Sequence, residues 1–253
     1  MFAGRSLRLY FYRSTNSFTF SYYSILVMKF KTIAFFILAF LVACTNSENK
    51  ISESFETWSV FNGNYTANKY SSLTQIDTSN VQQLRVAWEF HTGDGDTAAH
   101  SQIQCSPIMV NGVLYGTSPQ LKLFALDAAT GKQKWVFSPF EAINGEKRMH
   151  FVLNNNRGVT HWSDGKDDQR IFYAAGPYMH AINANTGKLV TSFGAGGKID
   201  LHDGLEMEGV NDLFVTSTSP PAIYNDVLIT GTRVSEGMDA APGHIRGYDV
   251  RTG

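Results

Sequence analysis

Short apolar runs separated by polar turns dominate the chain after residue 80, and no long helical pattern appears after residue 50. Two of these turns, Asn111-Gly112 and Asn225-Asp226, lie between apolar runs. Such dipeptides favour the positive backbone angles of a two-residue hairpin turn, so each pair of runs is expected to form antiparallel strands. The pattern predicts an all-β fold of short strands.

One segment of this pattern occurs three times along the chain. Each copy ends an apolar run with Asp or Asn and continues into a Thr-Gly turn. The copies are Ala125–Lys132, Ala181–Lys188 and Gly247–Gly253. The Asp or Asn side chain is expected to cap the turn, and the Gly to supply its positive φ. After the first copy, the next strand carries Trp135.

A further strand, in residues 107–115, 170–175 and 221–229, precedes each copy. The whole unit therefore has four short strands, and it recurs after 56 and then 66 residues. Four antiparallel strands in a unit of this length predict a β-propeller blade, the alternative being unrelated hairpins that share a common turn. About three units fit into residues 80–253, so we expect residues 57–253 to be part of a larger, truncated propeller.

The N-terminal region is expected to carry an export signal. Lys29 and Lys31 follow Met28, and residues 32–42 form an apolar run of eleven residues. Eleven helical residues span only about 16 Å, whereas the bilayer core measures roughly 30 Å, so a signal peptide over 28–43 is predicted instead of a transmembrane helix. Residues 1–27 are then an extension of uncertain status, with Met28 as the alternative initiator.

The end of this apolar run resembles a bacterial lipobox, Leu41-Val42-Ala43-Cys44. The resemblance implies that Cys44 becomes lipidated and is the new N-terminus, followed by a polar linker over 44–56. Thr45, in place of Asp, favours the outer membrane, so we expect a periplasmic protein that a lipid anchors to that membrane. Cys105 is the only other cysteine, so no internal disulfide is expected once Cys44 carries lipid.

Charge and composition exclude one class of partner. The chain is 43% hydrophobic and 17% charged, with a net charge of -1. This balance gives no electrostatic reason to expect nucleic acid as a partner.

Two segments resemble the opening of the dehydrogenases that depend on pyrroloquinoline quinone (PQQ). They are Trp58–Ile76 and Asn80–Asp94. The Thr-Gly turns with Trp135 are similar to the tryptophan-docking repeat of that family. The resemblance implies an eight-bladed propeller of four-stranded antiparallel blades, with PQQ near its axis and a divalent ion, usually Ca²⁺, against the quinone.

The resemblance also implies roles for five residues. Arg157, in Asn156-Arg157-Gly158-Val159, would pair with the anionic cofactor, and Gln104 and Thr218 would contact it through polar atoms. Glu236 would be a metal ligand, and His161 would line the substrate side of the cofactor site. For Arg157, Thr218 and Glu236 the alternative is an ordinary loop residue, and for Gln104 it is a buried strand residue facing a bridging water.

One departure from the family narrows the expected substrate. Alcohol-oxidising relatives carry two adjacent cysteines just before the Arg-Gly segment, whereas residues 151–156 here contain none. The sugar- or polyol-oxidising, membrane-linked type is therefore favoured over the methanol type. The catalytic carboxylate is expected in later blades, outside this sequence, so no catalytic residue is assigned.

These observations predict an enzyme that oxidises a sugar, polyol or alcohol hydroxyl by hydride transfer to PQQ. A respiratory acceptor, a quinone or cytochrome c, would take the electrons. The alternative is a propeller lipoprotein without cofactor that acts as an outer-membrane assembly scaffold. A third possibility is that the truncated chain is inactive by itself.

Overall fold

The computed structural model describes residues 57–98, 101–140, 155–205, 208 and 213–253. The chain divides into two units, Met1–Glu53 and Ser54–Gly253, and all described residues belong to the second. The predicted extension, signal peptide, lipidation site Cys44 and linker lie outside the described residues. Within the described part, no helix is long and apolar enough to cross a membrane.

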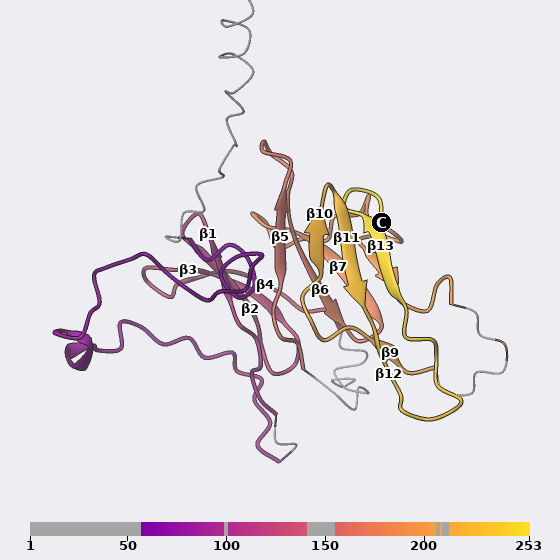
Figure 1. Cartoon of the computed structure of the whole chain (residues 1–253), viewed down its shortest axis with the longest axis horizontal. Coiled ribbons are helices and arrows are strands. Elements are labelled where there is room, and N and C mark those ends of the chain that lie inside the picture. Colours follow the sequence, from indigo (N-terminus) through magenta and orange to yellow (C-terminus); the bar gives the residue numbers. More distant parts are fainter. Residues whose placement is uncertain (1–56, 99–100, 141–154, 206–207, 209–212) are drawn as a thin grey trace, which may run out of the picture. The chain divides into compact units, whose positions relative to one another are not determined.

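Two four-stranded antiparallel sheets follow one another along the chain, each with its strands in sequence order (Figure 1). We call them blade 1 and blade 2. Blade 1 consists of β1 (Ile108–Val110), β2 (Val113–Thr117), β3 (Leu123–Asp127) and β4 (Gln133–Phe137). Blade 2 consists of β5 (Thr160–Ser163), β6 (Gln169–Ala175), β7 (Tyr178–Asn183) and β8 (Lys198–Asp200). Both sheets confirm the predicted four-stranded unit.

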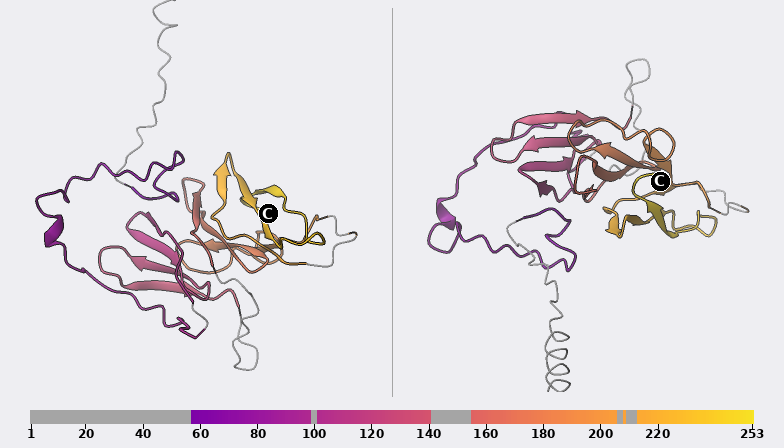
Figure 2. Two further views of the ribbon diagram at one scale, coloured as in Figure 1. Left: turned by 60° about the horizontal axis from the view of Figure 1, so that its bottom comes forward. Right: turned by 90° about the horizontal axis from the view of Figure 1, so that it is seen from above.

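The third sheet, blade 3, has three strands in the order β10-β11-β13, so the four-stranded prediction is met here only in part. A separate two-stranded pair, β9 with β12, accompanies it. The strands are β9 (Val215–Thr216), β10 (Ala222–Tyr224), β11 (Val227–Gly231), β12 (Arg233–Val234) and β13 (Ile245–Asp249). A short 3-10 helix, η1 (Val81–Gln83), precedes blade 1. The all-β prediction is confirmed, and Figure 2 shows the same sheets from two further sides.

Both predicted hairpin turns form. Asn111 and Gly112 have φ of 50° and 75° between β1 and β2, and Asn225 and Asp226 have φ of 45° and 63° between β10 and β11. The Thr-Gly turns are capped as expected: in the first, the Asp127 Oδ1 accepts hydrogen bonds from the backbone and hydroxyl of Thr130. Asn183 and Asp249 cap the other two turns in the same way.

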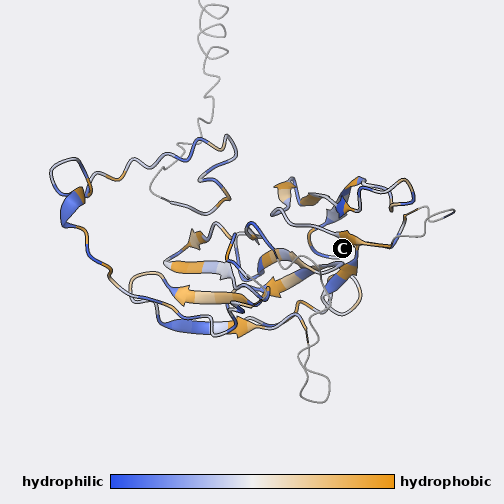
Figure 3. Cartoon of the chain, turned by 90° about the horizontal axis from the view of Figure 1, so that it is seen from below, coloured by the Kyte–Doolittle hydropathy of each residue, from blue (hydrophilic) through white to orange (hydrophobic). Residues whose placement is uncertain are grey.

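The core lies between blades, in two clusters that use opposite faces of blade 2. Ile171 and Tyr173 pack toward blade 1, whereas Phe172 and Ala174 pack toward blade 3. All four are residues of β6 and are no more than 2% exposed. This alternation is the period of two expected for a strand, and here both faces are apolar because both are covered. Figure 3 shows hydrophobic residues concentrated in the strands.

Tryptophans connect successive blades. The Trp135 Nε1 of β4 donates to the carbonyl of Ala184, beyond the end of β7, at 3.0 Å. The Trp88 Nε1 donates in the same way to the Ala128 carbonyl, after β3, at 3.2 Å. Trp88 precedes blade 1 in the sequence, so the docking contact that the repeat predicts occurs twice.

Blades 2 and 3 share the apolar cluster around Phe172, but the third Thr-Gly turn is held by polar groups instead. The Trp162 Nε1 of β5 donates to Asp226 Oδ1 at 2.8 Å, and the Arg251 guanidinium lies over the Trp162 ring, 4.8 Å from its centre. Arg170 Nη1 donates to the carbonyls of Val250 and Arg251, each at 2.8 Å. A charged network thus holds the third Thr-Gly turn where a docked indole holds the first two.

Candidate functional site

The segment before the first strand of each sheet takes part in a chain of backbone hydrogen bonds. The Ser106 N–H donates to the Arg157 carbonyl at 2.9 Å, and the Arg157 N–H donates to the Thr218 carbonyl at 2.8 Å. We call residues 104–106, 155–158 and 216–219 the inner segments. Arg157 therefore lies between the inner segments of blades 1 and 3, bonded to both.

Cys105, Asn156 and Ser217 precede the three residues that these backbone bonds join, and the side chain of each bonds within its own sheet. The Cys105 Sγ accepts a hydrogen bond from the Thr117 N–H at 3.3 Å, and the Ser217 and Thr230 hydroxyls lie 3.1 Å apart. Asn156 donates to the Ala174 carbonyl at 3.0 Å. Cys105 is a free thiol whose pKa burial raises, so it is a packing residue. Each inner segment is thereby fixed to its blade.

The side chains next to these residues, those of Gln104, Arg157 and Thr218, are more exposed. Arg157 and Gln104 are exposed, and Thr218 is half-buried. The Asn155 side-chain amide donates to Gln104 Oε1 at 3.4 Å, while the Asn155 Oδ1 is buried without a hydrogen-bond partner in the described part of the chain. The structure thus brings together three of the five residues predicted for the site, Gln104, Arg157 and Thr218.

This arrangement fits an anionic, carbonyl-rich cofactor such as PQQ. The Arg157 guanidinium forms no hydrogen bond or ion pair with other described residues, so its fork of donors is available to carboxylates. The side-chain amide of Gln104 and the hydroxyl of Thr218 supply neutral donors and acceptors next to it. The alternative, that Gln104 is a buried strand residue, does not hold, because Gln104 is exposed and precedes β1, whereas its role as a cofactor contact stays a prediction.

Glu236 is not joined to this group by any contact in the described residues. It is exposed in the connection between β12 and β13. Among the described residues, no group of three or more His, Cys, Asp or Glu side chains could hold a metal ion. The described residues therefore do not complete a metal site, and the role of Glu236 stays a prediction.

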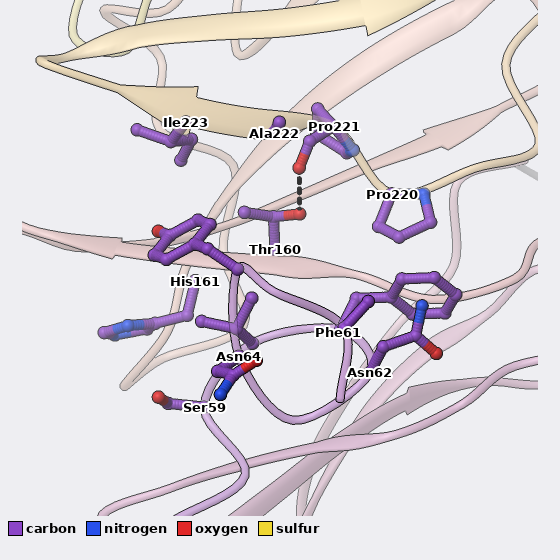
Figure 4. Close-up of a pocket in the computed structure, with 13 residues that line it drawn as sticks. Ser59, Phe61, Asn62, Asn64, Thr160, His161, Pro220, Pro221, Ala222 and Ile223 are labelled. Atoms are coloured by element: carbon purple, nitrogen blue, oxygen red, sulfur yellow. Dashed lines mark hydrogen bonds between the residues drawn. The ribbon is translucent and has the colours of Figure 1, made fainter. Parts of the chain in front are cut away.

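His161 lies in a different place, a pocket of about 210 Å³ (Figure 4). The turn 59–67, the start of β5 and residues 220–223 form its walls. Burial lowers the pKa of His161 below its ordinary value, against the opposing effect of a hydrogen bond with Gln169, so the ring is neutral near pH 7. The pocket does not include Arg157, Gln104, Thr218 or Glu236.

The sequence assigned no role to three residues near Arg157: Ser106, Asn155 and Asn156. Ser106 and Asn156 fix the backbone around Arg157, and Asn155 lies beside Gln104. Each belongs to the stretch just before the first strand of a repeat. An alignment of those stretches, and not only of the Thr-Gly turns, would have found them.

Residues 58–253 match the family described as the β-propeller domain of glucose, ethanol and alcohol dehydrogenases that carry PQQ. The chain is 30% identical over 214 residues to the quinoprotein glucose dehydrogenase of Escherichia coli, covering 78% of this chain and 26% of that protein. It is 30% identical over 219 residues to the glycerol dehydrogenase large subunit of Gluconobacter oxydans, covering 78% and 27%.

Solved structures of lower identity share the fold. The quinohemoprotein alcohol dehydrogenase of Comamonas testosteroni superimposes with a TM-score of 0.57 at 22% identity, over 78% of this chain and 26% of that one. A europium-containing methanol dehydrogenase gives 0.55 at 24%, over 81% and 32%. The chain spans about a quarter of the length of the curated relatives it matches. Because the family model matches residues 58–253, the chain belongs to the PQQ-dependent dehydrogenase β-propeller family.

Proposed function

We propose that the protein is a PQQ-dependent dehydrogenase that oxidises hydroxyl groups of sugars, polyols or alcohols. The observation that carries the proposal is the position of Arg157, bonded through its backbone to two neighbouring inner segments with its guanidinium unpaired by described residues. Relatives whose names describe glucose and glycerol dehydrogenases match over 78% of the chain. An exposed, unpaired arginine on a rigid backbone is suited to binding an anionic cofactor.

In this proposal the inner segments bind and orient the cofactor. Arg157 pairs with a carboxylate of PQQ, while Gln104 and Thr218 hydrogen-bond its carbonyl and carboxylate oxygens. When bound, PQQ supplies the chemistry of hydride acceptance. The described residues place no carboxylate among the inner segments, so the general base is expected elsewhere in the protein.

The metal, the acceptor and the location are parts of the same proposal. A divalent ion, Ca²⁺ by preference, would bind with Glu236 as one oxygen ligand. A respiratory quinone or cytochrome c would accept the electrons, and a lipid on Cys44 would anchor the protein to the outer membrane, facing the periplasm. The lipobox-like sequence at Leu41–Cys44 supports the anchor, and mass spectrometry of the mature N-terminus tests it.

The experiment is a reconstitution of the whole protein, purified without cofactor. Dye-linked oxidation of glucose, glycerol and ethanol should appear only after PQQ and Ca²⁺ are added. Arg157→Ala should weaken PQQ binding, measured by absorbance titration, by about tenfold to a hundredfold, the value of one charge-assisted pair. Arg85→Ala is the control, because Arg85 is exposed and, among the described residues, its side chain bonds only to the carbonyl of Leu84.

Two results would contradict the proposal. One is a protein that binds no PQQ although it is folded, which is the outcome expected for the assembly scaffold. The other is an equal loss of PQQ affinity in Arg157→Ala and Arg85→Ala. Replacing Glu236 with Gln separately tests the metal: it should raise the Ca²⁺ concentration needed for half-maximal activity.

A further inference from the structure

The pocket beside His161 is built by three segments that are far apart in the sequence. The turn 59–67 covers it, Thr160 and His161 come from β5, and residues 220–223 lead into β10 (Figure 4). The Thr160 hydroxyl donates to the Pro221 carbonyl and joins two of these walls. The pocket therefore depends on the folded arrangement of blades 2 and 3 and not on one local loop.

Backbone hydrogen bonds within the covering turn define its shape. The Gly63 N–H donates to the Val60 carbonyl at 2.9 Å, and the Lys69 N–H donates to the Asn62 carbonyl at 3.2 Å. Asn62, Ala67 and Lys69 have φ of 64°, 54° and 54°, in the left-handed region that side chains other than Gly seldom adopt. Such unfavourable angles persist only where surrounding structure imposes them, and they are concentrated at binding sites.

The chemistry of the lining excludes charged ligands. Among the described residues, no Asp, Glu, Lys or Arg lines the pocket, and His161 is neutral near pH 7. An anion such as PQQ, or a metal ion, would lie there without a counter-charge, which is unfavourable in a partly enclosed space. The pocket is therefore distinct in kind from the inner segments that carry Arg157.

The lining does match a neutral molecule that has both hydroxyl groups and C–H faces. Asn62 and Tyr65 carry amide and hydroxyl groups that can donate and accept hydrogen bonds, and the Thr160 hydroxyl, which donates to Pro221, can still accept one. Phe61 and Pro220 offer flat apolar surfaces. In addition, β5 and β10 are each the first strand of their sheet, so each has one edge without a neighbouring strand in the described part of the chain.

We propose that this pocket is a second binding site, for a neutral polyhydroxylated molecule of monosaccharide or polyol type. The site holds its ligand without PQQ or metal. It goes beyond the proposed oxidation, although its ligand belongs to the same chemical class as the proposed substrate. A molecule bound there would lie close to the inner segments, because Phe61 also approaches Gly158, where a Cβ would be 3.0 Å from the Phe61 ring.

The test measures D-glucose binding to the whole protein, purified without PQQ, by saturation-transfer NMR and calorimetry. D-gluconate, of similar size but with a negative charge, is the comparison ligand. We expect glucose to bind, and gluconate to bind at least tenfold more weakly. Glucose binding that is absent, or gluconate binding of equal strength, overturns the proposal.

Two pairs of variants locate the binding. Asn62→Gly removes an amide from the pocket, and glycine tolerates the positive φ at this position. Its control is Asn111→Gly, the same change at φ 50° in a hairpin turn outside the pocket. Tyr65→Leu and Tyr224→Leu each change an exposed tyrosine, 72% and 70% exposed, but only Tyr65 lines the pocket.

Asn62→Gly and Tyr65→Leu should each weaken glucose binding at least fivefold, whereas the two controls should bind like the unchanged protein. Equal loss in a pocket variant and its control contradicts the site. This result is separable from the proposed function. If the protein loaded with PQQ oxidises glucose but the cofactor-free protein binds no glucose, only the second site is contradicted. If the cofactor-free protein binds glucose but never binds PQQ, only the proposed dehydrogenase function is contradicted.

Discussion

The indole of Trp135 in blade 1 lies against Gly187 of blade 2, where a Cβ would come within 2.6 Å of the ring. Trp88 has the same relation to Gly131, at 2.5 Å. In both pairs the Gly closes a Thr-Gly turn and has a positive φ, 71° at Gly187 and 70° at Gly131. The glycine is therefore needed twice over, for the turn and for the indole that docks on it.

Gly187→Ala should destabilise the protein by about 2–4 kcal/mol. Roughly 1 kcal/mol comes from placing a side chain at positive φ, and the rest from the clash with the indole. Urea unfolding followed by tryptophan fluorescence measures the loss. Gly112→Ala is the control, since Gly112 has φ 75° but nothing within 4 Å of its Cβ position. Equal losses in the two variants would show that the docked indole adds nothing.

Asp226→Asn should lower the melting temperature at neutral pH, because the side chain keeps an acceptor for Trp162 but loses its ion pair with Arg251. Hydrogen bonds from Arg251 and then Trp162 lower the pKa of Asp226 below 3.8. A carboxyl group whose pKa is lower in the folded than in the unfolded state stabilises the fold at pH values above its unfolded-state pKa. This contribution is lost as the pH falls through the folded-state pKa.

The difference in melting temperature between the unchanged protein and Asp226→Asn should therefore be constant above about pH 5 and shrink below pH 3.8. Asp167→Asn changes an exposed aspartate in the turn between β5 and β6 and should show no such dependence. A difference for Asp226→Asn that persists unchanged at pH 3 would mean that the ion pair does not stabilise the junction.

His202 joins two acceptors. Its Nδ1 lies 2.6 Å from Asp200 Oδ1 and its Nε2 lies 2.7 Å from the Leu213 carbonyl. Neither partner can donate at neutral pH, so both bonds require a doubly protonated, charged ring. Burial lowers the pKa of His202, but the hydrogen bonds with Leu213 and Asp200 outweigh it, and the net shift is upward from 6.5.

A histidine whose pKa is higher in the folded than in the unfolded state stabilises the fold fully at pH values below its unfolded-state pKa. The contribution disappears as the pH rises through the folded-state pKa. We therefore expect amide hydrogen exchange near residues 200–203 and 213–215 to quicken, beyond the intrinsic base catalysis, as the pH rises above 6.5. His202→Gln should abolish this extra dependence, and His91→Gln, at an exposed histidine, should keep it. An unaltered profile in His202→Gln contradicts the bridge.

Features that depend on neighbours in sequence could be predicted. The cap of Asp127 on Thr130 and the hairpin at Asn111 involve residues within three positions, so the local pattern is sufficient. The contact between Trp162 and Asp226 could not be predicted, because the residues are 64 positions apart and the repeat predicts only that a tryptophan docks between neighbouring blades. The repeat pattern indicated that blades pack together, but not through which groups.

In the candidate site, too, some residues could be predicted from the sequence, but the contacts between distant segments could not. Arg157, Gln104 and Thr218 were predicted through a family resemblance, and the backbone bonds that join Arg157 to Thr218 had no signal in the sequence. The pocket at His161 was missed because its walls come from residues 59–67 and 220–223, which carry no shared pattern. Glu236 was predicted by the same resemblance, and its role as a metal ligand stays a prediction, because the described residues gather no group of ligands around it.

Asn156 positions Arg157, which follows it in the chain. Its side chain is 2% exposed, its Oδ1 accepts from the Gly158 N–H at 2.8 Å, and its Nδ2 donates to the Ala174 carbonyl at 3.0 Å. Asn156→Ala leaves both backbone groups without these partners, so the protein should lose about 1–3 kcal/mol of stability. It should also bind PQQ more weakly, because the backbone that carries the Arg157 guanidinium loses its bonds to the Asn156 side chain and keeps only those to Ser106 and Thr218.

A general loss of stability must be separated from misplacement of Arg157. Gly187→Ala serves as the matched control, because it destabilises the fold by a similar amount at a turn outside the inner segments. Absorbance titration with PQQ should show weaker binding for Asn156→Ala and unchanged binding for Gly187→Ala, both measured well below their melting temperatures. Equal affinities in the two variants would exclude the positioning role, since Arg157 would then bind PQQ without the support of Asn156.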